Sequence, residues 1–365
     1  TVSKIFMTGV TPITLDSLTS GFNIATKLTT DVRLNEMFGF TQAEVLDILE
    51  NINVPLDEIP SILTEMTHWY NGYLFNRKAK EKIYNPDMVL YFAKEYLINQ
   101  SFPDELLDTN IASDYRKVRN LFKLDNQEAA NITIIKSLLT TGSAVGELTR
   151  EYSFEKTWTK DDLLSLLFYQ GILTIAGSQL NRLTFEIPNA VIKQLYFSYF
   201  QQLTLMEANI QERQLNIWQQ VEQLAIHNRP QPVLDLMQEI IAKLATQDRA
   251  HFNELTFKAI FTAIFYGVNI YKIYSEREVR KSKTQKGRVD LLLLQRPPFD
   301  VPHQFVLELK YLSKKEMGQW ETVKQAAIQQ LSAYLKHDQD LQQLANLRAY
   351  VFLFSPEKSE AVVVS

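Results

Sequence analysis

The chain has 365 residues, of which 45% are apolar and 22% are charged, and its formal net charge at pH 7 is −4. This balance is that of a folded protein with two or three domains, and it excludes a disordered chain, a collagen and a coiled-coil rod. The absence of cysteine excludes a disulfide scaffold, a thiolate zinc site, an iron–sulfur cluster and a cysteine nucleophile. No apolar run is long enough to span a bilayer, so we expect no membrane partner.

Charge is unevenly distributed along the chain. From Phe252 to Ser365 there are 16 Lys and Arg against 12 Asp and Glu, whereas the first 251 residues carry 22 against 30. A polyanion such as nucleic acid is therefore expected to bind the C-terminal third. The acidic N-terminal region is the expected surface for a protein partner.

The first 130 residues predict a strand and several helices. Residues 3–10 have the pattern of a buried strand that runs into a loop. Thr41 and Glu44 form a capping box that predicts a helix. Proline at the first helical turn predicts two further helices, one over 60–70 and one over 86–97.

The next part of the chain predicts a small mixed unit. Residues 131–150 are predicted to be helical, with a soft Gly/Ser middle. A capped helix over 160–170 precedes two short β-like runs within 172–187 and a further helix from Pro188. This order resembles a winged-helix unit, which we assign to 131–205. Its surface is not basic, so we interpret it as a packing module rather than a DNA reader.

The remainder divides into a helical linker, 206–250, and a mixed α and β segment, 251–365. Prolines at 230 and 232 predict a helix break inside the linker. The order α, β, β, β, α, β is predicted for the final segment, over 251–266, 276–280, 287–295, 302–312, 315–335 and 348–355. We therefore expect a multidomain α+β or α/β protein.

Two charges interrupt the apolar strand FVLELK, residues 305–310. Strand alternation places Glu308 and Lys310 on one face, and a hairpin with the preceding strand would bring Asp290 beside Glu308. Two adjacent carboxylates repel unless a cation lies between them, and hard oxygen ligands suit Mg²⁺ or Mn²⁺. A neighbouring lysine can orient or deprotonate an attacking water, or stabilise negative charge. These groups predict metal-dependent hydrolysis of a phosphodiester.

The Asp290 and Glu308-x-Lys310 pattern, in this strand order, resembles the PD-(D/E)XK nuclease superfamily. The likeness covers residues 251–355 and includes Gly287-Arg288 and the A-x-x-Q-Q-L helix. A closer resemblance is to bacterial proteins that join an ATPase-like domain to a C-terminal nuclease of this superfamily. The segments KIFMTGVTPITLDSLTSGFN, WYNGYLF, YNP and LLFYQGILTI resemble the ATPase-like part, of which we expect a partial region over 1–130.

The resemblance implies an active centre built from two strands and the helix that follows them: Asp290, Glu308, Lys310 and Gln330, with Glu278 as an extra acid. Asp290 and Glu308 are the implied metal ligands. Gln329 is adjacent to Gln330, and spacing alone does not decide between them. The proline of the superfamily's name is Val289 here, at a position that varies widely in the superfamily.

Six basic residues flank the expected site: Arg277, Arg280, Lys281, Lys283, Lys286 and Arg288. As phosphate contacts they would position a nucleic-acid backbone without reading its sequence, and we expect DNA in preference to RNA. The alternative is a solvated hairpin loop.

The resembled ATPase-like proteins carry a phosphate-binding loop, and no G-x-x-x-x-G-K-[ST] occurs in this chain. We therefore expect no ATP as a ligand and interpret the first 200 residues as a scaffold or partner-binding surface. The chain begins with Thr1 rather than Met, so we expect a fragment or a processed piece. The expected location is the bacterial cytoplasm, or a host cell if the protein is a toxin or effector.

Other interpretations stay open at this point. Glu308 and Lys310 could form a surface salt bridge, with Asp290 as a strand-end cap. The protein could also be a catalytically silent nuclease-fold interaction protein or effector that acts by binding another protein. Convergence of Asp290, Glu308 and Lys310 favours the enzyme, because an interaction module does not need them together.

Overall fold

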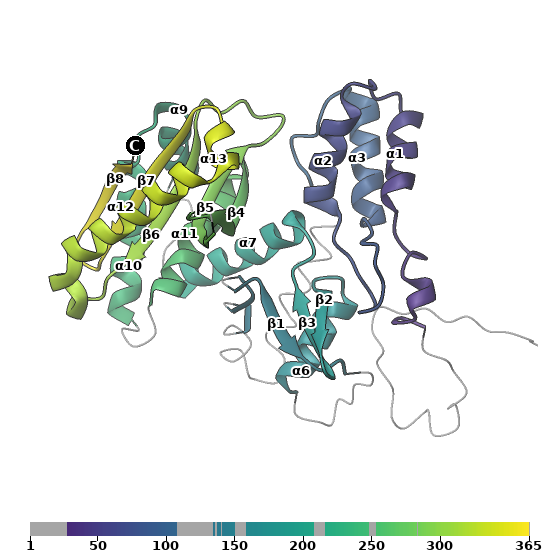
Figure 1. Cartoon of the computed structure of the whole chain (residues 1–365), viewed down its shortest axis with the longest axis horizontal. Helices are drawn as coiled ribbons and strands as arrows, with labels where there is room; N and C mark the ends of the chain where they lie inside the picture. The colour runs from purple at the N-terminus through teal and green to yellow at the C-terminus, as the bar shows by residue number, and fades with distance from the viewer. Residues whose placement is uncertain are drawn as a thin grey trace, which may run out of the picture. The chain divides into compact units, whose positions relative to one another are not determined.

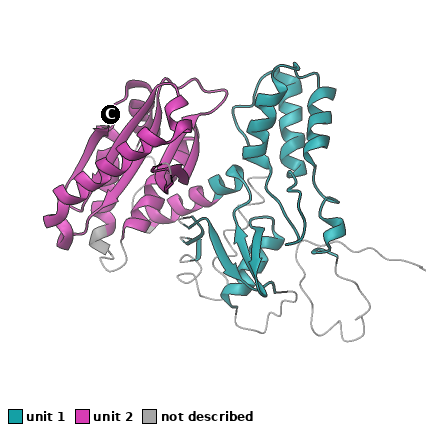
Figure 2. Ribbon diagram, in the orientation of Figure 1, with its two compact units in different colours: residues 1–195 teal, residues 196–365 magenta. Residues whose placement is uncertain are grey.

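The computed structural model describes residues 28–107, 134–149, 158–207, 216–247 and 253–364, apart from 136, 140 and 283. The chain divides into two compact units, Thr1–Leu195 and Tyr196–Ser365 (Figure 2). The boundary at 195 falls inside the predicted segment 131–205, and the four predicted segments, with boundaries at 130, 205 and 250, stay a prediction. The strand predicted at 3–10 lies outside the described residues. Within the described ranges, no helix combines the length and apolar content needed to cross a membrane.

Three helices open the described part of the first unit (Figure 1). After a short 3-10 turn, η1 (Val32–Leu34), come α1 (Gln42–Asn51), α2 (Ile59–Tyr70) and α3 (Pro86–Asn99). The Thr41 capping box is present, because the Thr41 hydroxyl accepts from the Glu44 N–H and the Glu44 carboxylate accepts from the Thr41 N–H. All three helices therefore lie where the capping and proline patterns predict them.

A small antiparallel sheet follows in the first unit. It contains β1 (Ser143–Gly146), β2 (Thr174–Gln179) and β3 (Arg182–Glu186) in the order β1-β3-β2. Along the chain α6 (Lys160–Tyr169) precedes β2, and α7 (Ala190–Glu207), which crosses the boundary between the units, follows β3. The helix predicted over 131–150 is wrong at its end. Gly142, with φ of 77°, introduces a turn, and β1 then pairs with β3. The predicted helix, hairpin and helix occur in order, and the winged-helix interpretation stays a prediction.

The second unit contains a five-stranded mixed sheet. Its order is β4 (Tyr271–Arg280), β5 (Lys286–Gln295), β6 (Gln304–Tyr311), β7 (Leu347–Phe354) and β8 (Ser359–Val364). Only β6 and β7 run parallel among these neighbours. Their connection contains η3 (Lys314–Gln319), α12 (Trp320–His337) and α13 (Gln339–Gln343). The predicted order of strands and helices is confirmed, and β8 is an additional edge strand.

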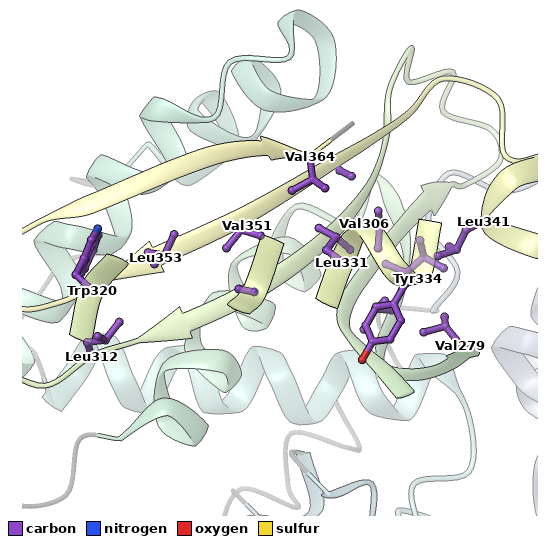
Figure 3. Packing of buried hydrophobic residues seen from close by; sticks show 14 residues of the cluster. Val279, Val306, Leu312, Trp320, Leu331, Tyr334, Leu341, Val351, Leu353 and Val364 are labelled. Atoms are coloured by element: carbon purple, nitrogen blue, oxygen red, sulfur yellow. The ribbon is translucent and has the colours of Figure 1, made fainter. Parts of the chain in front are cut away.

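Helices cover both faces of this sheet. On one face Val306 of β6 and Val351 of β7 belong to a buried cluster with Leu331 of α12 (Figure 3). On the other face Phe257 of α11 (Glu254–Val268) contacts Phe354, with ring centroids 4.8 Å apart. Two further helices, α9 (Ile217–His227) and α10 (Gln231–Gln247), precede α11, with the break between them at the predicted prolines. The middle of β6 is therefore buried on both sides.

Gly287 of β5 is required for the packing of α12. A Cβ at this position would lie 2.6 Å from Cε1 of Tyr334, whose ring is only 3% exposed (Figure 3). Gly287→Ala is therefore expected to lower the free energy of unfolding by about 2 kcal/mol, because a buried ring has little room to shift. Urea unfolding measures the change. Gly318→Ala is the matched control, since its Cβ would meet nothing within 4 Å, and an equal effect of both changes would contradict the prediction.

Candidate active site

The site lies where β5 and β6 separate. Their paired register ends at Leu291↔Leu307. Beyond this pair, the Asp290 side chain forms the hydrogen bond between the two strands. Its Oδ2 accepts from the Leu309 N–H at 2.7 Å. Strand β6 continues beside β7, with Glu308 opposite Val351. The predicted hairpin is confirmed, and the Asp290 carboxylate is fixed at the point where its two strands separate.

The Glu308 carboxylate is the most deeply buried acidic group of the site, at 1% exposure. Its Oε1 accepts from Lys310 Nζ at 2.7 Å and from Gln330 Nε2 at 2.9 Å. Its Oε2 is also buried, and no donor among the described residues reaches it. The structure thus brings Gln330 to Glu308, whereas Gln329 is exposed.

Two residues of α11 complete the ion-pair network, and sequence reasoning missed both. Lys258 Nζ lies 2.5 Å from Asp290 Oδ1 and 3.1 Å from Glu254 Oε1. Glu254 Oε1 is also 3.8 Å from Lys310 Nζ. The available signal was a Glu and a Lys four residues apart in an otherwise apolar helix, a spacing that places them on one face.

Glu276 of β4 is a further acidic residue near Asp290. It has φ of 54° and lies opposite Asp290, between the pairs Ser275↔Leu291 and Arg277↔Val289. Burial and then the charge of Asp290 raise the pKa of Glu276. A strand irregularity of this kind re-aims side chains, which is common beside active sites.

Glu278, the acid chosen from the sequence, lies elsewhere on the same strand. Its carboxylate accepts from Lys286 Nζ at 2.5 Å, and its side chain is 57% exposed. A role for Glu278 as an extra acid stays a prediction. No sequence signal distinguished Glu276 from Glu278, because the distinction depends on the left-handed backbone at Glu276.

Burial and charge set the protonation states of the site. Burial, followed by the charge of Asp290, raises the pKa of Glu308 to about 7. Burial alone would lower the pKa of Lys310, but the charges of Glu308 and Asp290 outweigh it and the pKa is raised. The pKa of Lys258 is raised in the same way, by Asp290 and Glu254 against burial. Both lysines are therefore ammonium ions at neutral pH, so Lys310 is suited to stabilise negative charge rather than to accept a proton.

Tyr334 lies one turn further along α12 than Gln330. Burial, and then the nearby Glu308 charge, raise the pKa of Tyr334, so the hydroxyl stays neutral. A neutral hydroxyl therefore lies near the Glu308 carboxylate.

The predicted basic residues differ in their surroundings. Arg277 forms an ion pair with Asp340 at 2.8 Å, and Lys286 is paired with Glu278. The side chains of Arg280, Lys281 and Arg288 are exposed. Lys283 lies outside the described residues. Phosphate binding by these six residues stays a prediction.

The Asp290 and Glu308 side chains fit a divalent metal ion in two respects. Both carboxylates are buried, at 7% and 1% exposure, and no donor among the described residues reaches the buried Oε2 of Glu308. Burying an unpaired carboxylate oxygen is unfavourable, and a cation would satisfy it. Within the described ranges, no three His, Asp or Glu side chains are arranged as a ready metal site. The ammonium of Lys258 lies between Asp290 and Glu254 instead.

Comparison with known proteins gives one family match. Residues 252–363 match the family model described as the PD-(D/E)XK nuclease superfamily. No curated protein matches the chain. These comparisons give no evidence for an ATPase-like region, so that resemblance stays a prediction. The matched residues run from the start of α11 into β8 and contain the whole site. Residues 252–363 of this chain are a PD-(D/E)XK nuclease superfamily domain.

Proposed function

We propose that the protein is a metal-dependent nuclease that hydrolyses phosphodiester bonds, with DNA preferred over RNA. The observation that carries this proposal is the buried Glu308 Oε2, which has no donor among the described residues and lies in the superfamily-matched domain beside a second carboxylate and an ammonium group. Buried side-chain oxygens rarely lack a hydrogen-bond partner, and a bound cation would supply a partner here.

Asp290 and Glu308 would hold the metal ion, for which Mg²⁺ and Mn²⁺ are the proposed candidates. When bound, such an ion would supply Lewis acidity, which activates water as a nucleophile and offsets negative charge on the phosphate. Lys310 then stabilises the negative charge that develops on the phosphate, from its position 2.7 Å from Glu308. Gln330 keeps Glu308 in place, since its Nε2 donates to Oε1.

Substrate binding in this proposal uses the exposed basic side chains near the site. Arg280, Lys281 and Arg288 would contact backbone phosphates, which supplies affinity without base readout. ATP has no part in the proposal, because the sequence carries no phosphate-binding loop. The first 200 residues would serve as a scaffold or partner-binding surface.

The test is cleavage of plasmid DNA, linear duplex, single-stranded DNA and RNA, each with Mg²⁺, with Mn²⁺ and with a chelator. We expect cutting of DNA that the chelator stops and that Asp290→Asn, purified identically, lacks. Asparagine keeps an oxygen that can accept the Leu309 N–H, so the variant should fold and also control for contaminating nucleases.

Cutting that persists in Asp290→Asn would place the activity outside this site. Preferential cutting of RNA would correct the substrate class and leave the chemistry in place. A folded wild-type protein that binds no metal and cuts none of these substrates would instead support the interaction-protein interpretation.

A further inference from the structure

Lys258 contacts a carboxylate oxygen of Asp290, a proposed metal ligand. Its side chain is 20% exposed, and Nζ contacts both Asp290 Oδ1 and Glu254 Oε1. The two contacts come from different elements, β5 and the first turn of α11. The ammonium therefore holds together two carboxylates that would otherwise repel each other.

The two oxygens of Asp290 are not equally available to a metal ion. Oδ2 accepts from the Leu309 N–H, a main-chain group inside a paired strand that cannot withdraw without breaking the sheet. Oδ1 accepts from Lys258, a long side chain with several rotatable bonds. A cation between Asp290 and Glu308 would take Oδ1 most easily, and Lys258 would have to leave it.

We infer that Lys258 is a positioning residue that acts as the counter-ion of Asp290 in the metal-free protein and is displaced from Asp290 when the metal binds. Glu254, one helical turn earlier, would retain the displaced ammonium. This inference rests on the proposed function, because it assumes that Asp290 is a metal ligand. It adds a competition between a side chain of the protein and the metal for one carboxylate oxygen.

The test uses two substitutions with opposite expected signs. Lys258→Met removes the competing charge, so Mn²⁺ should bind about tenfold more tightly. The metal-free variant should melt about 5 °C lower, because Asp290 loses its buried partner. Lys258→Arg keeps a charge that can hold a carboxylate through two parallel hydrogen bonds, so Mn²⁺ should bind about tenfold more weakly. Isothermal titration calorimetry at pH 8, without nucleic acid, measures both affinities, and circular dichroism follows melting.

Lys324→Met is the matched control. Lys324 is 18% exposed and pairs with Glu360, so it resembles Lys258 in burial and pairing but belongs to a separate ion pair. Its loss should leave Mn²⁺ affinity unchanged. A purely structural role for Lys258 would lower the melting temperature of Lys258→Met without tightening Mn²⁺ binding, and that result would overturn the inference. If Lys258→Met does not fold, Lys258→Arg decides alone: weaker binding supports the inference, and unchanged or tighter binding overturns it.

Failure of this inference is distinguishable from failure of the proposed function. A wild-type protein that binds no Mn²⁺ would overturn both. Mn²⁺ binding that Asp290→Asn abolishes, but that neither Lys258 variant alters, would overturn the inference alone.

Discussion

Lys310→Met is expected to reduce the rate of DNA cleavage by about 10³-fold without weakening Mn²⁺ binding. Removal of one preorganised charge that faces the developing negative charge typically costs a factor of this order. The Lys310 side chain is held in place, because it is 21% exposed and its Nζ lies 2.7 Å from Glu308 Oε1. The substitution leaves both proposed metal ligands in place and removes an ammonium from one of them, so metal affinity should be equal or higher.

Single-turnover cleavage and calorimetric titration with Mn²⁺ separate these two effects. Asp290→Asn should lose both cleavage and metal binding, whereas Lys310→Met should lose cleavage alone. Lys314→Met is a control, since Lys314 is 61% exposed and pairs with Glu357. It should cleave at the wild-type rate. A Lys310→Met protein that also cleaves at the wild-type rate would reduce Lys310 to a structural partner of Glu308.

Glu308→Gln is expected to abolish cleavage and, at the same time, to stabilise the metal-free protein at pH 8. Burial and the Asp290 charge raise the pKa of Glu308 to about 7 from an ordinary value of 4.5. The folded state therefore favours the protonated carboxyl. The contribution of protonated Glu308 to the free energy of unfolding is fully present below pH 4.5 and is lost as the pH rises through about 7. The loss is at most about 3 kcal/mol.

Urea unfolding of metal-free protein between pH 5 and pH 8 measures this effect. The wild-type free energy of unfolding should fall over the interval, and Glu308→Gln should remove that fall because glutamine does not titrate. Glu321→Gln, at a side chain 72% exposed on α12, should keep the wild-type profile. Saturating Mn²⁺ should restore stability at pH 8 in the wild type only. If the free energy of unfolding of the metal-free wild type does not change between pH 5 and pH 8, ionisation of Glu308 does not destabilise the fold.

The sequence predicted much of the nuclease-like domain because its elements are defined locally. Apolar strands, the two charges in FVLELK and a long helix after them predict the order of elements along the chain and a place for Glu308 and Lys310. Gln330 followed only from the superfamily resemblance. The prediction failed at residues 143–146, which form a strand only because β3 offers an edge for pairing. Local patterns do not contain that information.

The rest of the site depends on contacts between elements that are distant in sequence. Lys258 and Glu254 belong to a helix whose composition favours burial, and only docking of α11 on the sheet brings them to Asp290. The position of the Glu276 side chain depends on the left-handed backbone of Glu276 itself, opposite Asp290. A charged pair in an apolar helix was the clue that sequence reasoning could have used.

The parallel pairing of β6 with β7 has a consequence for protein synthesis. Strand β6 carries Glu308 and Lys310, yet its parallel neighbour is separated from it by the whole crossover that contains α12. The backbone that carries Glu308 and Lys310 therefore leaves the ribosome before β7, the strand that completes this part of the sheet. We expect the proposed nuclease activity to appear only after β7 has been made and has paired with β6.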